Sequence, residues 1–208
     1  LNIDACQIDI MCGGSQKVVS APPGLTFVVV SSDAKKAMTE RKTPIASFYA
    51  NLTTFAHYYE EKWFPYTMPI SDIYGLRAAF NLIAGDKTLY ERHARIGSAT
   101  RAAVKEAGLK LHLQSGYSNT VTVFDIPECT DAKSILDEMR TKYNIMLAGS
   151  FDELSGKVIR IGHMGENARL EHMVPALEAL SATLTDLGVT LQGNLADLFL
   201  KHYREFQD

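Results

Sequence analysis

A lysine follows a short glycine-rich turn near the start of the chain. Residues 13–17 read Gly-Gly-Ser-Gln-Lys, and they come between two apolar, strand-like runs at residues 8–12 and 25–30. Ligands collect outside strand ends in open α/β sheets, and glycines let the backbone approach a phosphate closely. A desolvated lysine at such a place is a nucleophile toward carbonyls. On spacing alone, however, the favoured interpretation of Lys17 is an ordinary surface lysine in a turn.

An arginine within an apolar strand is the second candidate for chemistry. Arg160 lies in residues 158–161, which read Val-Ile-Arg-Ile. Burying an unpaired charge is costly, so this guanidinium reaches solvent, pairs with a protein carboxylate or binds an anionic ligand. The residues alone favour the first two outcomes. The planar fork of an arginine nevertheless suits bidentate capture of a carboxylate better than a lysine would.

Composition limits the class of protein. The chain has 208 residues, of which 46% are hydrophobic and 22% charged, as expected of a soluble globular protein with one large domain or two small ones. A net charge of −3 without a basic cluster argues against a nucleic-acid partner. Apolar runs fall well short of the ~20 residues that cross a bilayer, which argues against a membrane role.

The three cysteines carry little functional signal. Cys6, Cys12 and Cys129 are widely spaced and show neither metal-ligand nor redox-pair spacing. We therefore predict no metal site, and we expect reduced, mostly buried thiols in a cytoplasmic protein.

Alternation and capping signals predict the elements that position the two candidates. Strands are expected at residues 8–12, 25–30, 109–113, 120–126, 145–148 and 158–161. Helices are expected at residues 32–38, from Ser71 onward, at 87–107, 131–143, 167–187 and 195–206, with Pro175 breaking or restarting the fifth of them. Strands and helices in this order predict an α+β arrangement for the later part of the chain, with a small antiparallel sheet covered by helices.

An aromatic stretch runs from residue 46 to residue 63. Its rings recur at mixed helical spacing, and the favoured interpretation is a helix packed onto the core. A subunit interface or the mouth of a cofactor site is the alternative. The rings are those of Phe48, Tyr49, Phe55, Tyr58, Tyr59 and Trp63.

Residues 14–17 (Gly-Ser-Gln-Lys) and 21–25 (Ala-Pro-Pro-Gly-Leu) resemble the cofactor-lysine segment of the class V aminotransferases. These are the alanine–glyoxylate and serine–pyruvate aminotransferases, pyridoxal phosphate enzymes of fold type I. Residues 64–69, 73–77 and 156–162 agree as well, and the similarity keeps its order from residue 1 to about residue 187.

The resemblance implies a fold and an activity. It places residues 1–85 in the C-terminal part of a large, doubly wound α/β domain that binds pyridoxal 5′-phosphate, and residues 86–208 in a small α+β C-terminal domain. It implies transamination between a small amino acid, alanine or serine, and a 2-oxo acid, glyoxylate or pyruvate. Because residues 162–165 (Gly-His-Met-Gly) also resemble the pyridoxamine–pyruvate transaminases, that activity is the alternative.

The same resemblance implies roles for individual residues. Lys17 is the Schiff-base lysine, Gln16 helps to hold the cofactor phosphate, and Arg160 holds the α-carboxylate of the substrate, with His163 in reach of the same pocket. Thr67 donates its hydroxyl to the phosphate of the neighbouring subunit. Several relatives have a phosphate-binding tyrosine at the place of Phe64, so Tyr66 is the remaining phenol of this segment and a candidate for that contact.

Other parts of such a site have no match in this sequence. The family's glycine-rich phosphate loop, the aromatic residue that stacks on the cofactor ring and the aspartate that pairs with the ring nitrogen all come before its cofactor lysine. We therefore expect this chain to be the C-terminal part of a longer enzyme, a homodimer, with the N-terminal portion possibly on a second chain. A hypothesis of another class is that the chain alone is a non-catalytic folding and dimerisation module.

Overall fold

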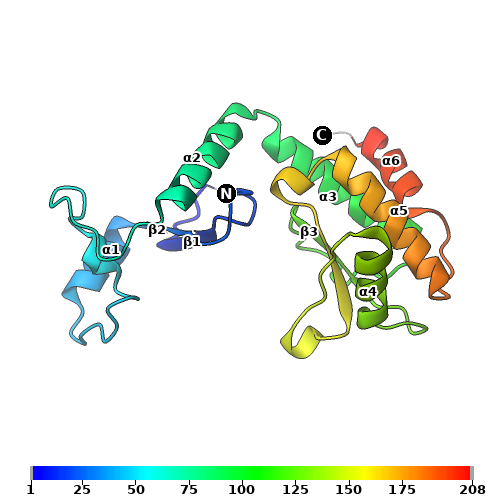
Figure 1. Cartoon of the computed structure of the whole chain (residues 1–208), viewed down its shortest axis with the longest axis horizontal. Coiled ribbons are helices and arrows are strands. Elements are labelled where there is room, and N and C mark those ends of the chain that lie inside the picture. Colours follow the sequence, from blue (N-terminus) through cyan, green and yellow to red (C-terminus); the bar gives the residue numbers. More distant parts are fainter. Residues whose placement is uncertain (1, 207–208) are drawn as a thin grey trace. The chain divides into compact units, whose positions relative to one another are not determined.

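The computed structural model describes residues 2–206, and the chain divides between Ile83 and Ala84 into two compact units (Figure 1). The first unit holds the segment of Lys17 and the second holds Arg160. The roles that the sequence assigns to residues 1–85 and 86–208, as cofactor-binding and small C-terminal domains, stay predictions.

A two-stranded hairpin is the centre of the first unit. Strand β1 (Ile10–Gly14) pairs antiparallel with β2 (Thr26–Val30), so that Gly13 lies opposite Phe27. Helix α1 (Ser32–Glu40) follows at once, because the Ser31 hydroxyl accepts a hydrogen bond from the backbone N–H of Ala34 and caps it. The predicted strands and the predicted helix at 32–38 are confirmed, with β1 beginning two residues later than expected.

The aromatic stretch does not form the expected helix. Within it the structure has only the short 3₁₀ helix η1 (Leu52–Phe55), and Tyr49 keeps 79% of its surface exposed. The rings contact one another instead, as in the stacked pair of Tyr49 and Tyr66 with centroids 5.1 Å apart. The reason is a lack of core, because Ala21 and Ala79 are the only buried hydrophobic residues in the described part of this unit. A helix packed onto the core is therefore wrong, and the interface or cofactor-mouth alternative stays a prediction.

Helix α2 (Ile70–Gly85) confirms the helix predicted from Ser71. Its apolar side chains are only partly covered, since Ile73 and Phe80 remain exposed. The start of the helix contacts the loop that carries Lys17. A Cβ at Gly75 would lie 3.3 Å from the ring of Pro22.

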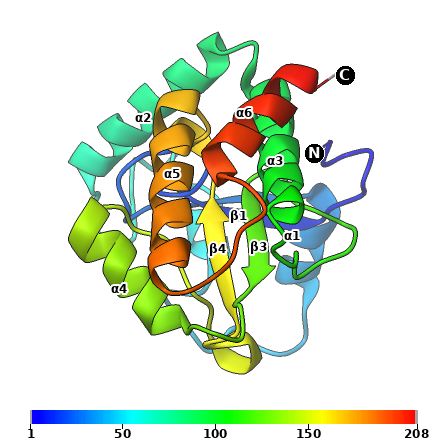
Figure 2. The ribbon, with the colours of Figure 1, turned by 90° about the vertical axis from the view of Figure 1, so that its right-hand side faces the viewer.

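Four helices and a two-stranded antiparallel sheet form the second unit (Figure 2). Strands β3 (Val121–Asp125) and β4 (Val158–Gly162) pair so that Val123 lies opposite Arg160. The helices are α3 (Leu89–Glu106), α4 (Ala132–Tyr143), α5 (Leu170–Asp186) and α6 (Leu195–Glu205), and the short 3₁₀ helices are η2 (Asp152–Leu154) and η3 (Gly165–Asn167). Unlike the first unit, this one has a continuous apolar core, which includes the fully buried Ile96, Phe124, Leu177 and Phe199.

Capping signals located the helices of the second unit well. The Asp131 side chain accepts the backbone N–H of Ser134 at the start of α4, and Asn144 ends that helix in the left-handed conformation. Gly108 follows the end of α3 with a φ of +86°, the left-handed conformation that glycine adopts readily after a helix. The helices predicted at 131–143, 87–107 and 195–206 are confirmed within two residues at each end.

Three expectations for the second unit are wrong. Residues 109–113 and 145–148 are not strands, because each contributes a single bridge, Leu111 to Phe124 and Ala148 to Arg160. Pro175 does not break α5, which runs through it. Burial of Leu177 and other residues of α5 in the core outweighs the hydrogen bond that a proline removes from a helix.

The cysteines also differ from expectation. Cys6, Cys12 and Cys129 are all free thiols, as predicted, but all three are exposed rather than buried. Cys6 and Cys129 lie in turns, and Cys12 lies on β1 of the first unit, where little core is available to cover it. Within the described residues, no helix combines the length and apolar character needed to cross a bilayer.

Candidate active site

The Lys17 loop, residues 15–25, joins β1 to β2 and is held by a buried serine. Ser15 is completely buried; its hydroxyl donates to the carbonyl oxygen of Pro22 at 2.6 Å and accepts from the N–H of Leu25 at 3.3 Å. The Lys17 N–H donates to Gly14 O at 3.1 Å, and Lys17 O accepts from Ser20 N at 2.9 Å. Lys17 therefore lies in a tight turn whose base is fixed. Sequence reasoning assigned no role to Ser15, and only its place before the lysine pointed to one.

The two glycines before the loop serve close packing. A Cβ at Gly13 would lie 2.3 Å from the Phe27 ring on the paired strand, so only glycine fits there without displacing that ring. At Gly14 the nearest atom to such a Cβ would be Oε1 of Gln16, at 2.7 Å. The side chain of Gln16 thus folds back over the end of β1. Its amide and the amino group of Lys17 are the polar groups presented at this strand end.

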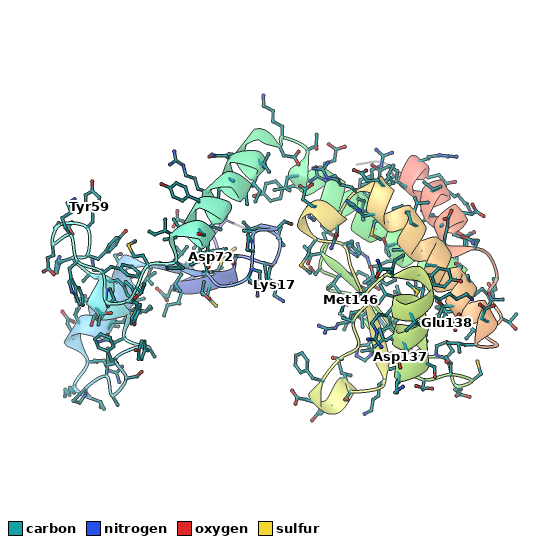
Figure 3. The ribbon with its side chains drawn as sticks, viewed as in Figure 1. Lys17, Tyr59, Asp72, Asp137, Glu138 and Met146 are labelled. Atoms are coloured by element: carbon teal, nitrogen blue, oxygen red, sulfur yellow. The ribbon has the colours of Figure 1, made fainter. Side chains whose placement is uncertain are left out.

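The amino group of Lys17 is free to react. The side chain is exposed, and among residues 2–206 it has neither an ion pair nor a hydrogen bond (Figure 3). No described residue of the first unit therefore competes with a ligand for the amine. The first unit also leaves it in contact with solvent, so desolvation of Lys17 stays a prediction for the complete site.

Tyr66 and Thr67 differ in what their hydroxyl groups already contact. The Tyr66 hydroxyl donates to the carbonyl oxygen of Tyr49 at 3.2 Å, and its ring stacks on that residue. A phenol has one proton to donate, so Tyr66 would have to leave this carbonyl to donate to a phosphate. Thr67 is exposed three residues before α2, and within the described chain its hydroxyl has no partner.

Arg160 lies in the middle of β4 with its guanidinium partly fixed. Its Nε donates to the carbonyl oxygen of Gly149 at 2.6 Å, and the guanidinium carbon lies 5.8 Å from the ring centroid of Phe151. No carboxylate among the described residues forms an ion pair with it. Since Nε is already bonded, the two terminal nitrogens remain for an anionic ligand. Their parallel N–H groups are the part of an arginine that binds a carboxylate in bidentate fashion.

His163 follows β4 on the opposite face of the sheet from Arg160. Along this strand Ile159, Ile161 and His163 are buried, whereas Arg160 is half-buried and Gly162 exposed. The expectation that His163 lines a pocket with Arg160 is therefore wrong within this unit, because alternate residues of a strand face opposite ways.

The ring of His163 is fully bonded. Its Nδ1 lies 3.2 Å from the carbonyl oxygen of Asn119, and its Nε2 lies 2.8 Å from the hydroxyl of Thr122. A carbonyl only accepts, so Nδ1 carries the proton and Nε2 accepts from the threonine. Burial, reinforced by the nearby cation Arg101, lowers the pKa of His163 from 6.5 to about 4.

This pKa predicts a pH dependence of stability. Between pH 6.5 and 4 the unfolded chain binds a proton at His163 that the folded chain does not, so the free energy of unfolding falls as the pH falls through this window. The expected loss is about 2 kcal/mol by pH 5. Chemical denaturation at pH 7, 6 and 5 measures it, with His163→Gln as the comparison. The carboxylates with lowered pKa values, such as that of Asp86, lose their contribution to stability only at lower pH, so they do not account for a change in this window. If the free energy of unfolding changed equally with pH in the natural protein and in His163→Gln, the prediction would be contradicted.

Sequence reasoning assigned no role to His93, which is buried. It is 5% exposed; its Nδ1 lies 2.7 Å from Leu89 O, and its Nε2 accepts from the N–H of Gly165 at 3.0 Å. The missed signal was periodicity. His93 lies on the same helical face as Ile96, Thr100 and Ala103, all of which are buried.

The structure brings some of the predicted site residues together and leaves others apart. Lys17 and Gln16 lie at one strand end, and Tyr66 and Thr67 lie just before α2, all within the first unit. Arg160 belongs to the second unit, so its meeting with Lys17 stays a prediction. Nowhere in residues 2–206 do three His, Cys, Asp or Glu side chains gather in a way that could hold a metal ion.

Comparison with known proteins gives a consistent picture. The family model described as "Aminotransferase class-V" matches residues 1–139. Serine–glyoxylate aminotransferase of Arabidopsis thaliana is 34% identical in an alignment 209 positions long, which covers 97% of this chain and 52% of that protein. Pyridoxamine–pyruvate transaminase of Mesorhizobium japonicum is 33% identical, over 88% of this chain and 48% of that protein.

Solved structures agree. The crystal structure of pyridoxamine–pyruvate aminotransferase from Mesorhizobium loti superposes with a TM-score of 0.90 at 30% identity, over 99% of this chain and 54% of that one. Ureidoglycine–glyoxylate aminotransferase from Bacillus subtilis gives a TM-score of 0.89, also at 30% identity, over 97% of this chain and 54% of that one. The chain thus spans about half the length of the relatives that it matches.

Proposed function

Because the chain belongs to the class V aminotransferases, pyridoxal 5′-phosphate enzymes of fold type I, we propose that it supplies the reactive lysine and the substrate-binding arginine of a transaminase. The substrates that we propose are alanine or serine as amino donor and glyoxylate or pyruvate as acceptor. The names of the relatives support this choice, since one of them is a serine–glyoxylate aminotransferase. The observation that carries the proposal is the free amino group of Lys17 in a turn fixed by Ser15.

The residues of the chain fit the cofactor in their chemistry. Bound pyridoxal phosphate supplies an aldehyde for an amine to condense with and a conjugated ring that accepts an electron pair from the substrate carbon. Lys17 presents the amine, while the amide of Gln16 and the hydroxyl of Thr67 present neutral donors suited to phosphate oxygens. Lys17 Nζ would hold the cofactor through its aldehyde. When it is not bound to the cofactor, the same amine would be the base that takes a proton from the substrate Cα and gives it up again.

Arg160 orients the substrate in this proposal. Its terminal nitrogens bind the α-carboxylate of the amino acid and later that of the 2-oxo acid, so one anchor serves both halves of the reaction. The bond from Nε to Gly149 O fixes the plane of the guanidinium before the substrate arrives. A fixed fork costs less ordering entropy on binding than a mobile one.

The decisive experiment for the activity compares two pairs of substrates. The enzyme loaded with cofactor is expected to turn over L-alanine with glyoxylate and to leave free pyridoxamine unused. Efficient use of free pyridoxamine with pyruvate would favour the alternative, pyridoxamine–pyruvate transamination. The pyridoxamine–pyruvate relatives and the Gly-His-Met-Gly segment at 162–165 support that alternative, although His163 is buried.

We further propose that the chain works within a longer protein and as a homodimer. The coverage of about half of each relative supports a missing N-terminal portion, on the same or a second polypeptide. Intact-mass measurement of the native protein tests this. The rival hypothesis of a non-catalytic folding and dimerisation module predicts that cofactor added to the isolated chain shows no absorbance band of a lysine adduct beyond the spectrum of the free cofactor. We place the protein in the cytoplasm, in keeping with its free thiols, and cell fractionation tests that placement.

The phosphate contacts can be separated by two substitutions. Thr67→Val keeps the shape of the side chain and removes its donor, so the dissociation constant of the cofactor is expected to rise about tenfold, the value of one hydrogen bond to a charged group. Tyr66→Phe is expected to leave it within about twofold if its proton stays on Tyr49 O. Titration of the apoenzyme measures both. Thr190→Val, at another exposed threonine, is the control. A larger effect at Tyr66 than at Thr67 would assign the phosphate to the phenol.

A further inference from the structure

The run of residues 160–165, from Arg160 to Gly165, is held by buried polar groups of two other elements. From α3, Nε2 of His93 accepts the N–H of Gly165 at 3.0 Å. From β3, the hydroxyl of Thr122 bonds to Nε2 of His163 at 2.8 Å. The two contacts fix the run at its fourth and sixth residues, and Gly165 has a φ of +59°, so its turn is defined as well.

These contacts are unusual for the core around them. The second unit buries six polar side chains among its described residues, and three of them, His93, Thr122 and His163, serve this single run. The others bond elsewhere; the hydroxyl of Ser181, for example, accepts the N–H of Leu195 at 2.8 Å. Buried polar networks specify one geometry more strictly than apolar packing does. A strand that only had to fill the core would not need three such groups.

Both histidines are held in one tautomer. Leu89 O and Asn119 O can only accept, so Nδ1 is the protonated nitrogen in each ring, and each Nε2 is an acceptor. His93 thereby receives a backbone donor and His163 a side-chain donor. Each ring uses both nitrogens, so neither is free for chemistry with a ligand.

We propose that His93 and His163 are positioning residues, which fix the run of residues 160–165 and thereby aim the Arg160 guanidinium at the substrate carboxylate. This inference rests on the proposed role of Arg160. The guanidinium is already tied to Gly149 O on one side, so a shift of β4 would move its terminal nitrogens relative to that anchor. Displacements near 1 Å in a positioning group cost up to about 10²-fold in catalysis.

The test compares His93→Leu with Ser181→Ala in the complete enzyme. Each substitution removes one buried hydrogen bond to a backbone N–H in the same unit, but only the first lies on the Arg160 run. His93→Leu is expected to raise the KM for L-alanine about tenfold with kcat nearly unchanged. It is also expected to speed hydrogen–deuterium exchange in the peptide covering residues 158–165. His93→Gln, which keeps an acceptor, is expected to show a KM and an exchange rate close to those of the natural protein.

The outcomes separate this inference from the proposed function. Ser181→Ala is expected to lower the melting temperature but to leave the KM unchanged. If His93→Leu lowers the melting temperature in the same way and leaves both the KM and the exchange of 158–165 unchanged, its role is only structural and the inference is overturned. Should that variant fail to fold, Thr122→Val, which is close in shape, is expected to raise the KM about threefold, and an unchanged KM there overturns the inference too. If Arg160→Ala leaves the KM unchanged, the proposed function itself fails.

Discussion

Replacing Lys17 with alanine is expected to abolish measurable transamination. The loss of its role in moving the substrate proton alone lowers the rate about 10²- to 10⁴-fold, and the loss of the amine that condenses with the cofactor adds to this. Lys17 is expected to have this effect because its amine has no other partner in the described chain and lies at the end of β1. Coupled assays of L-alanine with glyoxylate measure the rate, and cofactor absorbance reports the covalent link.

Controls for this prediction come from the same unit. Lys17→Arg keeps the positive charge but cannot condense with an aldehyde under these conditions, so it is expected to be as inactive as alanine. Lys36→Ala, at an exposed lysine of α1, is expected to leave the rate unchanged. Borohydride reduction followed by peptide mapping locates the covalent link directly. A reduced adduct on any other lysine would show that the assignment is wrong.

Replacing Arg160 with alanine is expected to raise the KM for the amino acid about 30- to 1000-fold. Removing one partner of a hydrogen-bonded charge pair costs about 2–4 kcal/mol, and the carboxylate would lose both terminal N–H donors. Arg160→Lys keeps the charge without the fork, so only part of the affinity should return. Initial rates at varied L-alanine and glyoxylate give the KM values. Both substrates should be affected, since each carries a carboxylate on the same anchor.

The matched control for Arg160 is an arginine with a known partner. Arg140→Ala removes an exposed guanidinium of α4 that is paired with Asp137 at 3.1 Å, and we expect no change in KM. Equal activity of the lysine variant and the natural enzyme would argue against bidentate binding. A fall in kcat without a rise in KM would place Arg160 outside the carboxylate site.

Local signals were enough to predict most of the second unit. Helix α4 was located by its Asp131 cap and the apolar spacing of its buried face, and β4 by the β-branched residues on either side of Arg160. Errors arose where contacts with distant residues determine the secondary structure. Residues 109–113 alternate like a strand but make one bridge to β3, and only the packing of α5 on the core shows that Pro175 is tolerated.

The site was predicted unevenly for the same reason. Lys17 and Arg160 came from a resemblance that covers short motifs, and the structure adds why each is available, through the absence of competing partners in the described residues. Ser15 and His93 were missed because a buried serine and a buried histidine look like surface residues until their partners are known. The aromatic stretch was misread because helical spacing of rings says nothing about whether a core exists to receive them.

The contact between the Lys17 loop and α2 limits how this segment can be engineered. Pro22 lies against Gly75. Gly24 has a φ of +139°, and a Cβ added to it would lie 3.1 Å from Oδ2 of Asp72, which is labelled in Figure 3. If the hairpin were grafted onto another protein without the first turns of α2, the Lys17 loop would lose the contacts that support it. A graft of the lysine site therefore has to include both the β1–β2 hairpin and the first turns of α2.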